Sequence, residues 1–267
     1  MHGKQRVIAP LFGEIGLQVM VSEQINTDLF GTFSGEIERQ ASQLETLRRK
    51  AAKCLEIHPQ HSLAIASEGA FHPHPASPFC VIHTEMVILK DGISGLEVIG
   101  SRVTMDFQVL CKMINEREEL DKFLNEISFP EYGVILKSQS GSRWQVAKDF
   151  QTRDEVMRAF ETLHTETENI TVESDLRAHR NPRRMKIIGE ATSDLIAKLQ
   201  SRCPHCDFAG YSVTAVKRGL PCEACGAPTR GVLKEIFTCA CCHGTEEKFF
   251  PQGKEYAPAG TCDDCNP

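Results

Sequence analysis

The residues best suited to metal chemistry are cysteines, and most of them lie near the end of the chain. Cys54, Cys80 and Cys111 are scattered through the first part, whereas the other nine of the twelve fall between Cys203 and Cys265. Eight of these nine form four pairs with C-x-x-C spacing, which is typical of structural zinc sites. The pairs are Cys203 and Cys206, Cys222 and Cys225, Cys239 and Cys242, and Cys262 and Cys265. We therefore predict two structural Zn²⁺ ions with four cysteine ligands each.

The spacing of the pairs predicts which of them share a zinc ion. Fifteen residues separate Cys206 from Cys222, which suits short strands that close around one tetrahedral zinc. The first and second pairs are thus expected at one site, and the third and fourth pairs at the other. At this other site Cys241 or His243 could replace one cysteine. A tail with so few large apolar side chains needs metal to fold, and closed sites of this kind stabilise a fold without catalysing a reaction.

A second group of chemically capable residues lies on a predicted helix and at the end of a predicted strand. Apolar residues recur at helical spacing over residues 43–57, where Glu45 and Lys50 occupy polar positions. A buried strand follows and ends at Glu68 and Gly69. If that end faces a crevice, these carboxylates and the lysine could hold a divalent cation and a phosphate together. A solvated helix face followed by a turn would give the same pattern.

Two stretches before this helix offer further phosphate ligands. Lys4 follows His2 and a glycine just ahead of an apolar segment, which could place its ammonium group beside a phosphate. Residues 22–42 form a long polar connection, and loops of this length are often functional. In this loop Thr32 and Ser34 could donate hydroxyl groups to a phosphate. An ordinary terminal tail and a plain surface loop are the alternatives.

A basic segment precedes the last helix predicted before the cysteine-rich tail. Asn181 and Pro182 are typical of a helix start, with Asn as the N-cap and Pro in the first turn. Arg177, His179 and Arg180 come directly before this start. Backbone N–H groups at a helix N-terminus and guanidinium groups suit a phosphate or an anionic base edge. The alternative is a basic surface turn.

Hydrophobic periodicity indicates alternating strands and helices across residues 1–200. Strands are predicted at Arg6–Pro10, Leu17–Val21, Ser62–Ser67 and Ile170–Glu173, hairpins at Val81–Thr104 and Tyr132–Lys148, and helices at Gln43–Ile57, Phe107–Ile127, 153–167 and from Pro182 onward. Two hairpins within this alternation imply an α/β domain with a mixed central sheet flanked by helices. We expect this domain at residues 1–200 and a double zinc ribbon at residues 201–267.

Composition sets the broad class of the protein. The chain is 41% hydrophobic and 25% charged, as in ordinary globular proteins, and its net charge of −6 argues against coating nucleic acid by charge alone. No apolar run reaches the length of a membrane span, and the start MHGKQRV lacks the apolar core of a secretory signal. These features predict a cytoplasmic protein that does not enter membranes.

Four short motifs resemble, in the same order along the chain, conserved motifs of the inosine triphosphatase and Maf superfamily. They are His2-Gly3-Lys4, the helix segment from Glu45 to Lys50-Ala51, the strand end Ala66-Ser67-Glu68-Gly69, and Ala178-His179-Arg180. Members of that superfamily hydrolyse non-standard nucleoside triphosphates to monophosphate and pyrophosphate with Mg²⁺. The resemblance implies an inosine triphosphatase-like fold, a nucleotide substrate and a Mg²⁺ or Mn²⁺ cofactor.

The resemblance also implies roles for individual residues. Glu45 and Glu68 would hold the metal or position water, Lys50 would bind phosphate, and these three residues form the expected catalytic set. The expected nucleotide-binding set comprises His2, Lys4, Thr32, Ser34, Gly69, Arg177, His179 and Arg180. The favoured prediction is therefore a Mg²⁺-dependent nucleoside triphosphate pyrophosphohydrolase.

The whole chain, from the segment GTFSGE to the tail that ends CDDCNP, also resembles a bacterial domain family of unknown function. This leaves open a non-catalytic module that binds a nucleotide or RNA, with the zinc ribbons contacting a protein or RNA partner; a homodimer is left open too. A zinc deaminase is a further alternative, since His83-Thr84-Glu85 or His164-Thr165-Glu166 could pair with Pro221, Cys222 and Cys225. The better-spaced partners of these two cysteines within the tail weigh against it.

Overall fold

The computed structural model describes residues 3–25, 41–74, 77–107, 109–140, 143–167 and 169–266. The chain divides into two compact units. One consists of Met1–Lys90 and Ile99–Leu195, and the other of Asp91–Val98 and Ile196–Pro267. The second unit therefore begins close to the predicted boundary at residue 200 and also takes in the turn of a hairpin.

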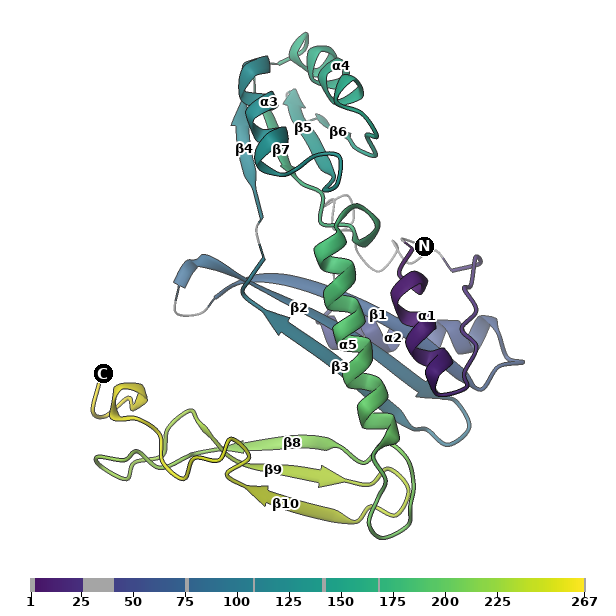
Figure 1. The fold of residues 1–267 in the computed structure, drawn as a ribbon, viewed down its shortest axis with the longest axis vertical. Coiled ribbons are helices and arrows are strands. Elements are labelled where there is room, and N and C mark those ends of the chain that lie inside the picture. Colours follow the sequence, from purple (N-terminus) through teal and green to yellow (C-terminus); the bar gives the residue numbers. More distant parts are fainter. Residues whose placement is uncertain are drawn as a thin grey trace. The chain divides into compact units, whose positions relative to one another are not determined.

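A three-stranded sheet with helices on both faces carries most of the predicted site residues. Its strands lie in the order β1-β2-β3. Helix α2 lies behind this sheet in Figure 1, whereas α1 and α5 lie in front of it. These elements are α1 (Gln5–Glu14), α2 (Gln43–Ile57), β1 (Leu63–His74), β2 (Ser77–Asp91), β3 (Glu97–Thr104) and α5 (Pro182–Gln200). The helix predicted at Gln43–Ile57, the start of the last helix at Pro182 and the first hairpin are thus confirmed.

Side chains alternate between the two faces of this sheet, and each face packs against different helices. Leu47 and Ala51 of α2 form a buried cluster with Ala64 of β1 and Ile88 of β2. On the opposite face, a Cβ atom added to Gly100 would lie 2.1 Å from the carbonyl oxygen of Ala191, so α5 packs directly on β3. Neighbouring residues of β1 therefore point to different faces of the sheet, one covered by α2 and the other by α1 and α5.

Three predictions of secondary structure in the first unit are wrong. Arg6–Pro10 belongs to helix α1 and not to a strand, because Ile8 and Phe12, four residues apart, are both buried on one helical face. Leu17–Val21 forms no strand. Phe107–Ile127 is divided between strand β4 and helix α3, where a single helix was predicted. Short apolar runs such as these do not separate helix from strand by periodicity alone.

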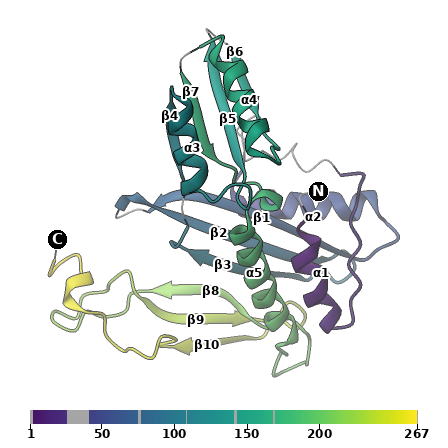
Figure 2. The ribbon, with the colours of Figure 1, turned by 45° about the horizontal axis from the view of Figure 1, so that its top comes forward.

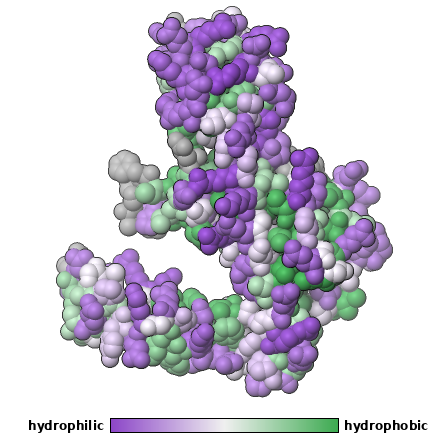
Figure 3. All heavy atoms as spheres, viewed as in Figure 1, coloured by the Kyte–Doolittle hydropathy of each residue, from purple (hydrophilic) through white to green (hydrophobic). Residues whose placement is uncertain are grey.

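A four-stranded antiparallel sheet follows in the same unit, with two helices on one face. Its order is β4-β7-β5-β6, and every neighbouring pair is antiparallel. Helices α3 and α4 contribute Phe123 and Phe160 to its buried core. Hydrophilic side chains cover most of this part in the view of Figure 3. The elements are β4 (Cys111–Ile114), α3 (Arg117–Glu126), β5 (Val134–Ser140), β6 (Arg143–Ala147), α4 (Arg153–His164) and β7 (Ile170–Ser174).

The second unit contains a small antiparallel sheet with the order β10-β9-β8. Its strands are β8 (Val213–Arg218), β9 (Val232–Thr238) and β10 (Thr245–Phe249). The buried cluster beside it consists of Cys203, Tyr211 and Cys239, so cysteines occupy positions that large apolar residues usually fill. This supports the prediction that the tail needs metal to fold.

The described residues thus form an α/β protein with three separate sheets, in place of the single mixed sheet expected. No helix among the described residues is both long and apolar enough to cross a membrane.

Candidate functional site

The predicted pair Lys50 and Glu68 meets on the α2 face of the first sheet. Lys50 Nζ lies 2.5 Å from Glu68 Oε2, and only 12% and 4% of the two side chains are exposed. The side-chain amide of Gln43, two helical turns before Lys50, donates to the carbonyl oxygens of Glu68 and Thr84. The N-terminal half of α2 is thereby fixed against the two strands at this pair.

A second buried ion pair lies on the opposite face, and the sequence did not predict it. Arg184 Nε of α5 donates to Glu85 Oε1 of β2 over 2.5 Å, and His83 Nε2 lies 3.0 Å from the same oxygen. Burial would raise the pKa of Glu85, but the Arg184 charge and the His83 hydrogen bond outweigh it and lower this pKa to about 2. Glu85 Oε2 is buried and has no hydrogen-bond partner among the described residues.

Lys4 joins this face of the sheet at the start of α1. Its Nζ donates to the hydroxyl of Ser67 over 3.0 Å. Burial and the positive charge of Arg184 lower the pKa of Lys4 to about 8, although Glu85 and Glu68 oppose the shift. Lys4 therefore loses its proton in a pH range where an ordinary lysine stays charged.

Lys50 and Glu68 meet on one face of the sheet, whereas Lys4 and Gly69 belong to the cluster on the other face, and Glu45 lies outside both groups. Successive residues of a helix turn by about 100°, so Glu45 lies nearly opposite the face that carries Lys50. Its carboxylate pairs with Arg49 instead, and 48% of the side chain is exposed. The expected shared metal site of Glu45 and Glu68 does not form here. His2, Thr32 and Ser34 lie outside the described residues.

Gly69 is the tightest position in this cluster, and its replacement tests the packing. A Cβ atom at Gly69 would lie 2.5 Å from both Arg184 Nη2 and Glu85 Oε1, which are themselves fixed by the buried ion pair. We expect Gly69→Ala to lower the free energy of unfolding by about 1–3 kcal/mol through overpacking. Gly13→Ala in α1 is the matched control, because its Cβ meets nothing within 4 Å and alanine favours a helix. Equal urea midpoints for the two variants would contradict the packing described.

A cleft of about 1020 Å³ lies beside the N-termini of α1 and α5. Its charged lining consists of Arg6, Arg177, Lys186 and one carboxylate, Asp149, and the imidazole of His179 lies beside them. The rest of the lining is small or apolar: Gly3, Val7, Ala178, Pro182 and Met185. The cleft thus combines positive charge with apolar walls, which suits an anionic organic ligand.

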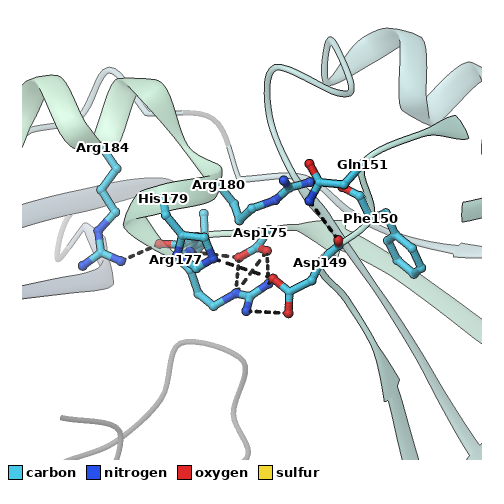
Figure 4. A network of polar contacts seen from close by, with 9 residues as sticks. Asp149, Phe150, Gln151, Asp175, Arg177, His179, Arg180 and Arg184 are labelled. Atoms are coloured by element: carbon cyan, nitrogen blue, oxygen red, sulfur yellow. Dashed lines mark hydrogen bonds and ion pairs between the residues drawn. The ribbon is translucent and has the colours of Figure 1, made fainter. Parts of the chain in front are cut away.

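Arg177 lies in this cleft between two carboxylates (Figure 4). Its Nη2 atom lies 2.7 Å from Asp149 Oδ1 and 2.6 Å from Asp175 Oδ2, and Asp175 is buried. These pairs raise the pKa of Arg177, although burial opposes them. Arg177 is therefore charged at any ordinary pH, and its orientation is fixed.

His179 and Arg180 form a short 3₁₀ helix with Ala178 and turn in different directions. His179 lines the cleft, with Nε2 3.7 Å from Asp149 Oδ1. Burial and the Arg177 charge lower the pKa of His179, so its imidazole is neutral at neutral pH. Arg180 instead donates to the carbonyl oxygen of Phe150. Two of the three predicted basic residues thus line the cleft, and Arg180 holds the backbone behind it.

The residues that sequence reasoning missed are Glu85, Arg184, Asp149 and Asp175. Glu85 was considered only as part of a deaminase motif. Arg184 looks like one more charge in a basic run, and the two aspartates follow strands with no motif around them. Alternation along β2 was an available signal, because it places Glu85 on the same face of the strand as Val87 and Leu89, which are buried.

The zinc unit holds the eight predicted cysteines in two groups, but their pairing differs from the prediction. Cys203 and Cys206 lie with Cys239 and Cys242, and Cys222 and Cys225 lie with Cys262 and Cys265. The first pair therefore shares its site with the third, and the second with the fourth. The expected sharing between consecutive pairs is wrong.

The sheet of the zinc unit explains this interleaving. Val213 at the start of β8 pairs with Phe237 near the end of β9, so the cysteines before β8 meet those after β9. At the other end, Cys222 forms a bridge with Ala257, which brings the last pair of cysteines to the second pair. Strand β8 lies within the fifteen-residue interval between Cys206 and Cys222 and carries these two cysteines to opposite ends of the sheet.

The geometry of both groups fits zinc. The Sγ atoms lie 3.7 Å apart for Cys203 and Cys242 and 3.5 Å apart for Cys206 and Cys239. The corresponding distances in the other group are 3.9 Å and 3.7 Å. A tetrahedron with Zn–S bonds of about 2.3 Å requires S–S distances of about 3.8 Å. Two structural zinc sites are therefore compatible with this arrangement.

Backbone hydrogen bonds favour the thiolate form of one cysteine in each group by lowering its pKa. N–H groups of Cys242 and Cys241 lower the pKa of Cys239 to about 6, and those of Cys225 and Ala224 lower that of Cys222 to about 7. Cys241 and His243 lie outside both groups. Because Cys222 and Cys225 share a site with two other cysteines, the deaminase alternative loses its ligands.

Comparison with known protein families identifies a family that includes the cysteine-rich tail but has no assigned activity. Residues 50–267 match the family described as Domain of unknown function (DUF6671). No curated protein and no solved structure matches the chain significantly. The match spans well over half of the chain, including both cysteine groups. The chain therefore belongs to the DUF6671 family.

Proposed function

We propose that this protein binds a nucleotide through its phosphate groups. The observation that carries the proposal is the cleft of about 1020 Å³, which is lined by Arg6, Lys186 and Arg177, the last of them already paired with Asp149 and Asp175. Guanidinium and ammonium groups are the usual ligands of phosphate, and the apolar walls suit a base or a ribose. The N-terminus of α5 borders the same cleft through Pro182 and adds a favourable dipole.

Calorimetric titration with a panel of nucleoside triphosphates tests this function. We expect binding at one site, weakened at least tenfold in Arg6→Met and Lys186→Met because each loses a charge-assisted contact. Lys122→Met, an exposed lysine of α3, is the matched control and should bind like the wild type. A folded, zinc-loaded protein that binds none of the triphosphates would overturn the proposal.

The pH dependence of binding reports on Lys4, which follows Gly3 of the cleft. Because the pKa of Lys4 is about 8, we expect triphosphate affinity to fall as pH rises through 8 and the ammonium charge is lost.

The same pKa also makes stability depend on pH. Between pH 8 and the ordinary lysine value, the unfolded chain holds a proton on Lys4 that the folded protein lacks. Stability should therefore rise with pH in that window. Lys4→Met should remove both effects, and a pH profile unchanged by Lys4→Met would contradict the assignment.

Mg²⁺-dependent hydrolysis to monophosphate and pyrophosphate is a second candidate function. It is supported by the presence of Lys4, Lys50, Glu68 and Gly69 near the same part of β1, on its two faces, since they come from three separate motifs of the inosine triphosphatase-like pattern. A likeness to that superfamily's fold is part of the same proposal. The three separate sheets weigh against that likeness.

The candidate ligands for Mg²⁺ among the described residues are two buried carboxylates on opposite faces of the three-stranded sheet. Glu68 Oε2 is engaged by Lys50, whereas Glu85 Oε2 has no described partner. Mg²⁺ is commonly held by one or two carboxylates together with substrate phosphates and water, so either carboxylate alone could serve as its protein ligand. When bound, the ion would neutralise charge that develops on the phosphates. The chain itself would supply Lys4 and Arg177 as positive charges at the phosphates.

Release of pyrophosphate from the bound triphosphates separates binding from hydrolysis. Glu68→Gln, Glu85→Gln and Glu45→Gln should be compared, with the exposed Glu56→Gln as the control. Loss of turnover in Glu68→Gln and Glu85→Gln alone would place the reaction at the buried pairs, and loss in Glu45→Gln would favour the site implied by the resemblance. Tight binding without turnover would leave a nucleotide-binding protein.

A further inference from the structure

We propose that Glu85 and Arg184 are positioning residues for the cleft. Together they hold the carbonyl group of Leu176 and so fix the segment that presents Arg177 and His179 to a ligand. The inference rests on the proposed function insofar as the cleft is the ligand site. Its first test below does not require any ligand.

Arg184 connects the first sheet to the segment before α5 through two hydrogen bonds of one guanidinium group. Its Nε atom donates to Glu85 Oε1 over 2.5 Å, and its Nη1 atom donates to the carbonyl oxygen of Leu176. The side chain is 1% exposed, and that of Glu85 is fully buried. The Arg184 backbone is fixed as well, because its N–H donates to Asn181 Oδ1 over 3.0 Å.

Because the guanidinium group is planar and rigid, its bond to Glu85 also fixes the orientation of its bond to the Leu176 carbonyl. Its donors form a rigid fork, so a carboxylate that binds Nε also sets the direction in which Nη1 points. His83 in turn holds the carboxylate, and its ring stacks on Phe71 at a centroid distance of 4.2 Å. The guanidinium lies against Gly69 of β1 in the space that a side chain there would fill, since an added Cβ would lie 2.5 Å from Nη2. The position of the Leu176 carbonyl is therefore set from β2.

The Glu85–Arg184 pair positions the side of the cleft that carries Arg177 and His179. Leu176 directly precedes Arg177, whose fork grips Asp149 and Asp175, and His179 follows two residues later (Figure 4). Asp149 and Asp175 come from the four-stranded sheet, after β6 and β7. The segment is thus held from that sheet through the aspartates and from the three-stranded sheet through Arg184. Both supports must be present for Arg177 and His179 to keep their places.

Arg184→Lys tests the role with a conservative change. Lysine keeps the positive charge beside Glu85 but lacks the second arm that reaches Leu176. Arg183→Lys is the matched control on the next residue, whose side chain is 39% exposed. We expect NMR titration of the full zinc-loaded chain to show the pKa of His179 rising toward its usual value in Arg184→Lys only, because the imidazole gains solvent when the segment loosens.

A binding measurement with inorganic tripolyphosphate provides the second readout. We expect Arg184→Lys to weaken it about tenfold, the loss typical of one hydrogen bond that involves a charged group. Glu85→Gln/Arg184→Met, which removes both charges of the buried pair together, should shift the His179 titration in the same direction. If that double variant does not fold, Arg184→Lys decides the question.

An unchanged His179 titration in folded Arg184→Lys would overturn the positioning role. Failure of the wild-type chain to bind tripolyphosphate would instead count against the proposed function. In that case the NMR result still decides whether the pair fixes the segment, so the two failures are distinguishable.

Discussion

Replacing Cys206 and Cys225 together by serine should abolish zinc binding, whereas replacing Cys206 and Cys242 together should leave one zinc ion per chain. The first variant damages both cysteine groups, and the second damages only one of them. The measurement is zinc content by elemental analysis after washing with a competing chelator. Sharing between consecutive pairs, as the sequence suggests, would give the opposite result: one zinc ion for the first variant and none for the second.

The loss of a zinc ion should also unfold the end of the second unit that it closes. Structural zinc contributes on the order of 10 kcal/mol to the folding of small domains. Cys241→Ser is the control, because this exposed cysteine belongs to neither group. It should retain both ions. A loss of zinc in Cys241→Ser would show that this cysteine is a ligand after all.

Lys50→Met should lower the free energy of unfolding of the first unit by about 3–5 kcal/mol, because it leaves the Glu68 carboxylate buried without its cation. Only 12% of the Lys50 side chain and 4% of that of Glu68 are exposed, so water can replace little of the lost interaction. Urea unfolding can be followed by the fluorescence of Trp144, the single tryptophan of the chain, which lies in β6 of this unit.

The same substitution at the exposed end of α2 provides the control. Lys53 pairs with Glu56, but 43% and 67% of these side chains are exposed, so Lys53→Met should cost less than about 1 kcal/mol. Lys50→Met/Glu68→Gln should recover part of the lost stability, since it removes the unpaired charge. If Lys50→Met costs no more than Lys53→Met, the buried pair does not have the importance described here.

The zinc ligands could be predicted from the sequence, whereas their pairing could not. A C-x-x-C pair is a local feature, so all eight ligands are visible in the printed sequence. Which pairs share an ion depends on strand register: β8 and β9 run antiparallel and bring the two ends of a long segment together. Spacing between consecutive pairs carries no information about this register.

The charged cluster was predicted in part, for a related reason. The helical periodicity of Gln43–Ile57 and the apolar strand after it gave the meeting of Lys50 and Glu68. The resemblance assigns Glu45 to the same site as Glu68, but the helix turns Glu45 away, and its carboxylate pairs with Arg49. Glu85 lies on a different strand and Arg184 on a distant helix, so only the folded chain brings them together.

The error at the N-terminus shows the same limit on a smaller scale. The short apolar run at Arg6–Pro10 was taken for a strand, although it forms part of α1. Lys4 nevertheless reaches the predicted neighbourhood, because the helix begins directly after it and its side chain extends to Ser67 on β1. A correct residue was thus found through a wrong element.

A crystal structure of the zinc-loaded protein with a non-hydrolysable nucleoside triphosphate analogue would show whether the cleft is the nucleotide site. We expect phosphate density in the cleft, within hydrogen-bond distance of Arg6, Arg177 or Lys186, with the base or ribose against the apolar wall near Met185. Analogue bound elsewhere on the protein, with this cleft empty, would rule out the proposed site.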